Sequence, residues 1–315
     1  MRRRRTVPDV LEPCGVNRDE LVHGGYRSPP EDRGSPKIVV RLKADATGEI
    51  IGRVESDLLV QRDARITTIT LNRPDALNSF DARLAADLGH AIRDAALDGH
   101  CRVIVLTGAG RAFCAGADVG YLKQLIDTHD WVKARELVGN GAGAVAAIVS
   151  APKPVIAAVN GAAAGGGANL ALACDIRVAS DRASIGQVFS RVGLHPDLGG
   201  TFFLPRLVGL GKALELVFTG DMIDAAEGHR LGIFNRVVAA DALMDETRAL
   251  AKRLVDKPPL AIARAKKALY QGSQASLSEM LAIELESQIA LFSSEDAREG
   301  IEAFVEKRPP HFRGV

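Results

Sequence analysis

The segment that most constrains the fold is a glycine triplet between an apolar run and a helix-forming run. Val155–Val159 is rich in β-branched residues, as in a buried strand, and Gly165–Gly167 precedes an Ala/Leu run typical of a helix. Glycine lets a ligand approach the main chain, and the first turn of a helix offers free N–H groups and a positive dipole end. We therefore expect a strand-to-helix junction that can hold an oxygen becoming negative during a reaction. A tight turn that only packs a helix against a sheet is the alternative reading.

Length and composition narrow the class of protein. The chain has 315 residues, enough for one large domain or two modest ones, and 47% of them are hydrophobic, enough for a sizeable core. The net charge of +1 gives no general argument for a nucleic-acid or anionic-membrane partner. No apolar run approaches the ~18 residues that a transmembrane helix needs. We expect neither nucleic acid nor membrane as a partner.

The cysteines indicate a cytoplasmic protein without a metal centre. Cys14, Cys101, Cys114 and Cys174 lack the paired spacing of a metal site, and a reducing compartment is the default for such a chain. Arg2–Arg5 is not followed by the apolar region of a secretory signal.

Three regions are expected along the chain. Residues 1–56 mix charge, proline and glycine with little periodicity, which indicates a disordered or loosely attached extension. Residues 57–205 alternate strand and helix patterns, which predicts an α/β core. Its expected strands are Ile66–Leu71, Arg102–Thr107, Pro154–Val159 and Asp175–Ala179. Residues 206–315 form a helical C-terminal region with expected helices at Lys212–Thr219, Asp224–Leu231, Asp241–Lys257 and Leu260–Tyr270.

A second loop of small residues, Gly108–Asp118, directly follows the strand Val103–Leu106. Ligands of α/β proteins bind at the carboxyl ends of the strands, and loops on neighbouring strands can each direct one N–H at a single oxygen. A dinucleotide site is excluded by context, because the G-x-G-x-x-A run Gly141–Ala146 follows a helical pattern instead of a strand.

Several segments in order resemble the crotonase (enoyl-CoA hydratase/isomerase) superfamily, from about residue 60 to the C-terminus. They are Leu71–Asn78, Phe113–Asp118, Pro154–Gly161 with Gly165–Gly167, and Phe304–Arg308. The resemblance implies an α/β spiral of ββα units with a helical C-terminal region, assembled as a homotrimer or a dimer of trimers. It also implies an acyl-CoA thioester substrate and no metal or redox cofactor, coenzyme A being part of the substrate.

The resemblance assigns roles residue by residue. The backbone N–H groups of Ala117 and Gly166 would form an oxyanion hole, which stabilises a thioester enolate more than the neutral carbonyl. The residues expected to line the CoA cleft are Asp75, Ala76, Leu77, Asp118 and Val119. Lys307 and Arg308 are candidates for CoA phosphate contacts, with a solvated basic tail as the alternative.

The chain departs from the family's hydratases at the two positions of their catalytic glutamates. Asn169 and Phe189 stand there, and neither side chain can carry a proton. Hydration needs one group to activate water and another to protonate carbon, so the usual hydratase mechanism is not expected. We keep Asn169 and Phe189 as substrate-binding candidates.

Asp197 is the candidate proton shuttle. The stretch Phe189–Pro205 resembles the ring-epoxide (phenylacetyl-CoA pathway) isomerases and the dienoyl-CoA isomerases, which place a catalytic aspartate at this position. A double-bond shift needs a single base, and the surrounding apolar residues would raise the pKa of this carboxyl. An Asx turn or cap before Gly199–Gly200 is the alternative role.

The sequence thus predicts an enoyl-CoA double-bond isomerase. The alternatives are a hydratase with other catalytic residues and a non-catalytic acyl-CoA-binding member of the family. Cys114 lies in the first glycine loop, and we interpret it as a buried packing residue because no His or Asp motif supports a thiol nucleophile.

Overall fold

A computed structural model describes residues 56–315 of the chain. The extension predicted for residues 1–56 lies, apart from Ser56, outside the described residues. Within residues 56–315, no helix combines the length and the apolar character needed to cross a membrane.

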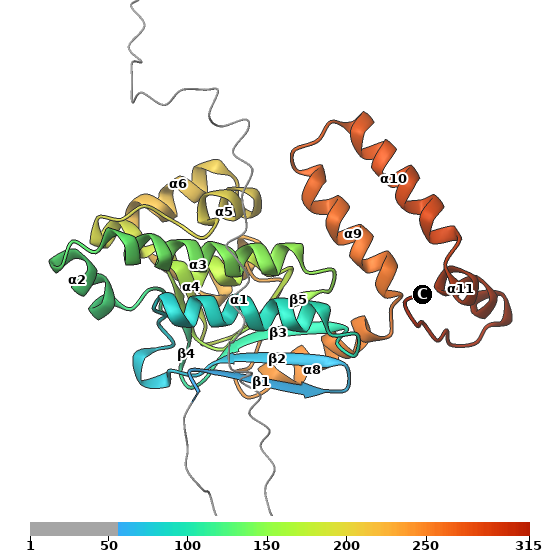
Figure 1. The fold of residues 1–315 in the computed structure, drawn as a ribbon, viewed down its shortest axis with the longest axis horizontal. Helices are drawn as coiled ribbons and strands as arrows, with labels where there is room; N and C mark the ends of the chain where they lie inside the picture. Colours follow the sequence, from blue (N-terminus) through green and yellow to red (C-terminus); the bar gives the residue numbers. More distant parts are fainter. Residues whose placement is uncertain (1–55) are drawn as a thin grey trace, which may run out of the picture. The chain divides into compact units, whose positions relative to one another are not determined.

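The larger of two sheets has six strands in the order β1-β2-β3-β5-β7-β10. Four of them, β1, β2, β3 and β5, are labelled in Figure 1. β1 pairs antiparallel with β2, and the remaining neighbours are parallel. Every residue of β3 and β5 is buried, which explains the apolar runs Val103–Leu106 and Val155–Val159, because a parallel sheet is covered on both faces. The strands are β1 (Leu58–Asp63), β2 (Ile66–Leu71), β3 (Val103–Gly108), β5 (Val155–Val159), β7 (Ile176–Ser180) and β10 (Arg236–Val238).

The smaller sheet has four short strands in the order β4-β6-β8-β9. Three of them directly follow strands of the larger sheet, so β3–β4, β5–β6 and β7–β8 are successive strand pairs, and a helix follows each of the first two pairs. This repetition confirms the expected ββα spiral. The strands are β4 (Ala112–Cys114), β6 (Ala162–Ala164), β8 (Ser184–Gly186) and β9 (Met222–Asp224).

Four helices surround the ends of these strand pairs. They are α1 (Ala82–Leu97), α2 (Val119–Asp127), α3 (Trp131–Ser150) and α4 (Gly166–Ala173). α1 and α3 pack side by side through their apolar faces (Figure 1), and residues such as Leu88 and Ile148 are almost completely buried. α4 runs through the interior and is buried along its whole length, and its first two residues, Gly166 and Gly167, belong to the glycine triplet.

The helices expected after residue 205 are present, but the α/β core does not end there. α5 (Gly200–Val208), α6 (Leu210–Thr219), α7 (Ala225–Arg230) and α8 (Leu243–Val255) follow one another. β9 and β10 lie among them, and β10 extends the larger sheet beside β7. The sequence prediction missed both strands, since three residues are too few to show a strand period.

Three C-terminal helices complete the described chain: α9 (Pro259–Gly272), α10 (Leu277–Phe292) and α11 (Glu295–Glu306). α9 is fastened to the core by Lys266, whose Nζ donates to the carbonyl oxygen of Ile148 at 2.9 Å and to Asp175 Oδ2 at 2.8 Å. Asp175 also accepts from Tyr270 Oη at 3.1 Å and from the Val155 N–H at 2.7 Å. A buried ion pair with this many hydrogen bonds makes Asp175 a structural residue.

Candidate active site

The two glycine loops predicted from the sequence meet in the structure. A Cβ at Gly116 would lie 3.2 Å from the Gly166 nitrogen and 2.8 Å from the Ala164 carbonyl oxygen. The φ of Gly116 is +93°, a conformation that side-chain-bearing residues rarely adopt. The loop before α2 and the N-terminus of α4 therefore touch through backbone alone.

The local hydrogen bonds define the direction of the Ala117 backbone. The Phe80 N–H donates to the Gly116 carbonyl at 2.9 Å, and the Asp118 N–H donates to the Phe80 carbonyl at 2.9 Å. These bonds form a parallel bridge around Ala117 that does not use its N–H. Gly166 is the first residue of α4, where a helix has no internal partner for its N–H. Within residues 56–315, neither N–H donates a hydrogen bond to the protein.

Cys114 and Gly167 explain how closely the loops pack. A Cβ at Gly167 would lie 2.1 Å from the Cys114 carbonyl oxygen, so only glycine fits. The Cys114 Sγ donates to the Asn78 carbonyl at 3.1 Å, and burial raises the pKa of this thiol to about 12. A thiol that stays protonated is a poor nucleophile, which agrees with the interpretation of Cys114 as a packing residue.

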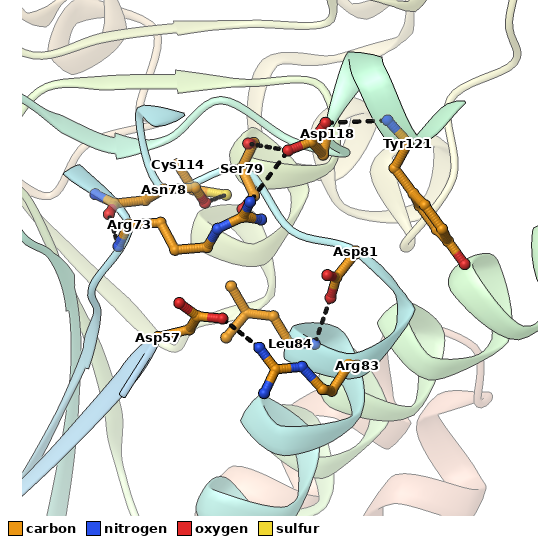
Figure 2. A network of polar contacts seen from close by, with 10 residues as sticks. All are labelled: Asp57, Arg73, Asn78, Ser79, Asp81, Arg83, Leu84, Cys114, Asp118 and Tyr121. Atoms are coloured by element: carbon orange, nitrogen blue, oxygen red, sulfur yellow. Dashed lines mark hydrogen bonds and ion pairs between the residues drawn. The ribbon is translucent and has the colours of Figure 1, made fainter. Parts of the chain in front are cut away.

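Asp118 binds groups of its own chain. Figure 2 shows Arg73 and Ser79 reaching one of its carboxylate oxygens, at 3.3 and 3.4 Å, while the other accepts from the Tyr121 N–H at 3.1 Å. The last bond caps α2 and, together with Arg73, lowers the pKa of Asp118. Asp118 thus holds the first glycine loop in place, and the next residue, Val119, is 71% exposed.

The other predicted CoA residues lie in a short turn against this loop. Asp75 and Ala76 belong to a 3₁₀ turn, Pro74–Ala76, and Leu77 follows with φ +51°. The Leu77 carbonyl accepts from the Ala115 N–H at 3.0 Å, which fastens the turn to the loop that contains Ala117. Asp75 is exposed, and Ala76 and Leu77 are half-buried.

Asp197 lies in the loop before α5 with an unpaired carboxylate oxygen. Its Oδ1 is buried and has no hydrogen-bond partner among the described residues, and desolvation raises its pKa from 3.8 to about 6. The alternative role as a cap is not borne out, because α5 begins after Gly199 without a side-chain cap. The next residue, Leu198, would be 3.6 Å from a Cβ at Gly166. The Asp197 loop therefore reaches the glycine pair, by which we mean Gly116 and Gly166.

Phe189 and Asn169 occupy different surroundings. Phe189 is 8% exposed and would lie 3.6 Å from a Cβ at Gly165, so it forms an apolar wall beside the triplet. Asn169 is 0% exposed, and its amide bonds the Asp197 carbonyl and Gln187. Asn169 therefore lies beneath the Asp197 loop, and its contact with substrate stays a prediction. The sequence prediction overlooked Gln187, whose only signal is a polar side chain in an apolar stretch.

The basic residues near the C-terminus are engaged within the chain. Arg308 makes a two-pronged bond to Glu299, at 2.7 and 2.8 Å, and a further bond to Glu306 at 2.6 Å. Lys307 ends α11 in a left-handed conformation. The guanidinium of Arg308 therefore stabilises the end of α11, whereas the side chain of Lys307 is exposed and its contact with a CoA phosphate stays a prediction.

The spiral of strand pairs, with two glycine loops meeting at the start of a buried helix, defines the crotonase fold. An enoyl-CoA hydratase from Bacillus anthracis has this fold, with a TM-score of 0.79, 34% identity, and coverage of 82% of this chain and 100% of the other. The family profile described as enoyl-CoA hydratase/isomerase matches residues 61–315, and the chain belongs to this family of enzymes acting on acyl-CoA thioesters.

Relatives carry names from both branches of the family. A "probable enoyl-CoA hydratase" from Rhodobacter capsulatus is 43% identical over 249 residues, covering 79% of this chain and 95% of the relative. The 1,2-epoxyphenylacetyl-CoA isomerase of Escherichia coli is 38% identical over 253 residues, covering 79% and 95% respectively. Most names among the relatives are those of hydratases.

Proposed function

We propose that this chain is an enoyl-CoA isomerase in which Asp197 moves a proton between two carbons of the acyl chain. The observation that carries the proposal is the half-buried Asp197 carboxylate, whose Oδ1 is buried and unpaired among the described residues, in a loop whose Leu198 lies close to Gly166. Asn169 and Phe189 occupy the hydratase glutamate positions. A single carboxylate suits a reaction that needs one base.

The reaction follows from the two N–H groups and the base. The thioester oxygen of a 3-enoyl-CoA accepts hydrogen bonds from Ala117 and Gly166. The Asp197 carboxylate removes a proton from C2, and the electron pair moves into a dienolate whose negative oxygen the two donors stabilise. The carboxylic acid then returns the proton to C4, which leaves a conjugated 2-enoyl-CoA. One such donor is typically worth about 3 kcal/mol in the transition state.

The pKa of Asp197 suits this exchange. A carboxyl with a pKa of about 6 is mostly ionised at neutral pH and therefore ready to accept a proton. It is also a stronger base than an ordinary aspartate, because desolvation raises its pKa by more than its own backbone N–H and the nearby His195 lower it. No metal or redox cofactor enters the proposal, and coenzyme A arrives as part of the substrate, in a cleft lined by Asp75, Ala76, Leu77, Asp118 and Val119.

The names of the relatives favour the second candidate, a hydratase. Against it stand the buried amide of Asn169 and the apolar ring of Phe189, since neither can activate water or protonate carbon. A non-catalytic acyl-CoA-binding protein is the third candidate. It would keep the glycine pair but have no use for a desolvated carboxylate.

One assay with the full chain separates these candidates. The protein is incubated with a 3-enoyl-CoA and, separately, with a 2-enoyl-CoA. We expect the 3-enoyl substrate to become conjugated, seen as a rise in absorbance, and little hydrated product from the 2-enoyl substrate by mass spectrometry. Rapid hydration without isomerisation would overturn the proposal in favour of the hydratase. Saturable binding without turnover of either substrate would overturn it in favour of the binding protein.

We also propose that α10 mediates self-association. This helix has no buried residue, although four large apolar side chains lie four residues apart along it, each at least half exposed. Leu277 is 76% exposed, Leu281 56%, Leu285 59% and Ile289 58%. Figure 1 shows α10 running beside α9, with this long helix far from the sheets. An apolar stripe of this length is typical of an interface, and a homotrimer or dimer of trimers would cover it.

Replacing both Leu281 and Leu285 with glutamate is expected to convert the assembly to monomers at micromolar concentration, because charges cannot be buried unpaired in an interface. The mass in solution is measured by light scattering after size-exclusion chromatography. Leu97→Glu is the control, since this side chain is 85% exposed but lies at the end of α1. A wild-type protein that is already monomeric, or a double variant of unchanged mass, would contradict the proposal.

A further inference from the structure

A chain of two buried amides connects the proposed base loop to the interior. The Gln187 Nε2 donates to the Asn169 Oδ1 at 2.7 Å, and the Asn169 Nδ2 donates to the Asp197 carbonyl oxygen at 2.9 Å. Asn169 is 0% exposed and Gln187 is 2% exposed. Because the Asp197 carbonyl can only accept, the Asn169 nitrogen is the end directed at the Asp197 loop, and the Asn169 oxygen accepts from Gln187, whose Oε1 has no partner among the described residues. The orientation of the Asn169 amide is thereby defined.

These amides join three separate segments. Asn169 lies on α4, one turn after Gly166, whose N–H is a proposed oxyanion donor. Gln187 follows β8 directly, and Asp197 precedes α5. A rigid helical turn therefore separates the proposed donor from the residue that holds the backbone of the proposed base.

The loop needs this support, because its backbone is unusual. Leu198 has φ +46° and Gly199 has φ +80°, two successive residues in the left-handed region, and Leu198 pays a steric cost there. The Asp197 carbonyl accepts from the Gly200 N–H at 2.9 Å as well as from Asn169. A Cβ at Gly200 would lie only 2.5 Å from the Asn169 Nδ2, so the fit around this amide is tight.

A carboxylate at position 169 could not donate the hydrogen bond that Asn169 gives to the Asp197 carbonyl. It has no N–H to donate, so its oxygen would face the Asp197 carbonyl oxygen, acceptor against acceptor. It would also place a second negative charge beside the buried Asp197 carboxylate. An ionised carboxylate at position 169 would therefore remove the side-chain support of the Asp197 carbonyl.

We propose that Asn169, oriented by Gln187, is a positioning residue that holds the Asp197 carboxylate in register with the Gly166 N–H. The proposal rests on the proposed function of Asp197 as the base. Under it, Asn169 is part of the isomerase machinery instead of the remnant of a lost hydratase glutamate.

Asn169→Asp is the decisive variant, because it keeps the shape of the side chain, removes the NH₂ donor and adds an ionisable oxygen beside Asp197. We expect kcat for the isomerisation to fall about 10- to 100-fold, the size of effect that a misplacement of about 1 Å produces. KM should change by less than about 2-fold, because residue 169 does not reach the substrate. Gln187→Leu frees the Asn169 amide to turn and should lower kcat in the same direction by a smaller factor.

Thr247→Val is the matched control. Thr247 is 0% exposed and lies on α8, and its hydroxyl has no hydrogen-bond partner among the described residues. It tests whether loss of any buried polar group affects kcat, and we expect no change. If Asn169→Asp does not fold, Gln187→Leu carries the test. The proposal would be overturned if a folded Asn169→Asp or Gln187→Leu variant kept the wild-type kcat, or if its KM rose while its kcat stayed unchanged.

A crystal structure of Asn169→Asp tests the proposal separately from the proposed function. We expect the Asp197 carboxylate to be displaced from its position relative to the Gly166 nitrogen. Displacement in a protein whose wild type does not isomerise would refute the function of Asp197 but not the positioning by Asn169. An unmoved Asp197 loop would refute the positioning, whatever the activity.

Discussion

Asp197→Asn is expected to lower kcat/KM for the conversion of 3-enoyl-CoA to 2-enoyl-CoA by about 10²- to 10⁴-fold, the usual contribution of a general base. The amide has nearly the same shape but cannot accept the C2 proton. The rise in absorbance of the conjugated thioester measures the rate. Asp245→Asn is the control, since that carboxylate is 86% exposed on α8 and should leave the rate unchanged.

The same residue should set the pH dependence of the wild-type enzyme. The base works only when ionised, so kcat/KM should be constant above the pKa of Asp197, about 6, and fall as the pH drops through it. In Asp197→Asn, the residual kcat/KM should no longer fall as the pH drops through 6. A limb near pH 4 in the wild type would show that the base is an ordinary exposed carboxylate instead.

Asp197→Asn should also stabilise the fold at neutral pH. Burial raises the pKa of Asp197 from 3.8 to about 6, so between these values the folded protein holds a proton that the unfolded chain releases. Stability from this group is therefore complete at low pH and is lost as the pH rises through this window. With allowance for partial exposure, removing the charge should raise the free energy of unfolding at pH 7 by on the order of 1–2 kcal/mol. Urea denaturation at pH 4 and pH 7 measures the difference, and equal effects at both would contradict the assignment.

Gly116→Ala is expected to lower kcat by about 10²- to 10³-fold, the cost of losing one oxyanion donor. A Cβ at this position would lie 2.8 Å from the Ala164 carbonyl and 3.2 Å from the Gly166 nitrogen, so it must push the two loops apart. We expect the proposed oxyanion donors, the N–H groups of Ala117 and Gly166, to be displaced from one another as a result. KM should rise less than kcat falls, because the neutral thioester depends less on these donors than the enolate does.

The control separates this effect from backbone strain. Gly232 has φ +79°, close to the +93° of Gly116, but the nearest atom to a Cβ there is 3.8 Å away. Both alanine variants pay the left-handed penalty of about 1–2 kcal/mol, and only Gly116→Ala forces the loops apart. Steady-state kinetics below the melting temperature of both variants compares them. Equal kcat values would refute a role for the loop contact in catalysis.

Much of the architecture was readable from local patterns. The strands of the larger sheet that are buried on both faces carry unbroken apolar runs, and helices such as α1 carry apolar residues at helical spacing. The glycine triplet predicted a place where two backbone segments approach closely. The structure has such a contact, because only a residue without a Cβ fits where Gly167 meets the Cys114 carbonyl. β10 escaped prediction, since its three residues pair with β7 only through the tertiary fold.

The candidate site divides in the same way. The residue types on the chain predict two backbone loops that can receive an oxygen and, by the family resemblance, one carboxylate, Asp197, in place of a pair of glutamates. Tertiary structure decided which side chains are free to act. Asp118 and Arg308 are tied to partners of their own chain, and Asn169 is buried under the Asp197 loop. The physical reason is that burial and hydrogen-bond pairing depend on residues far apart in sequence: Asp197 gained its raised pKa from desolvation by the folded chain around it.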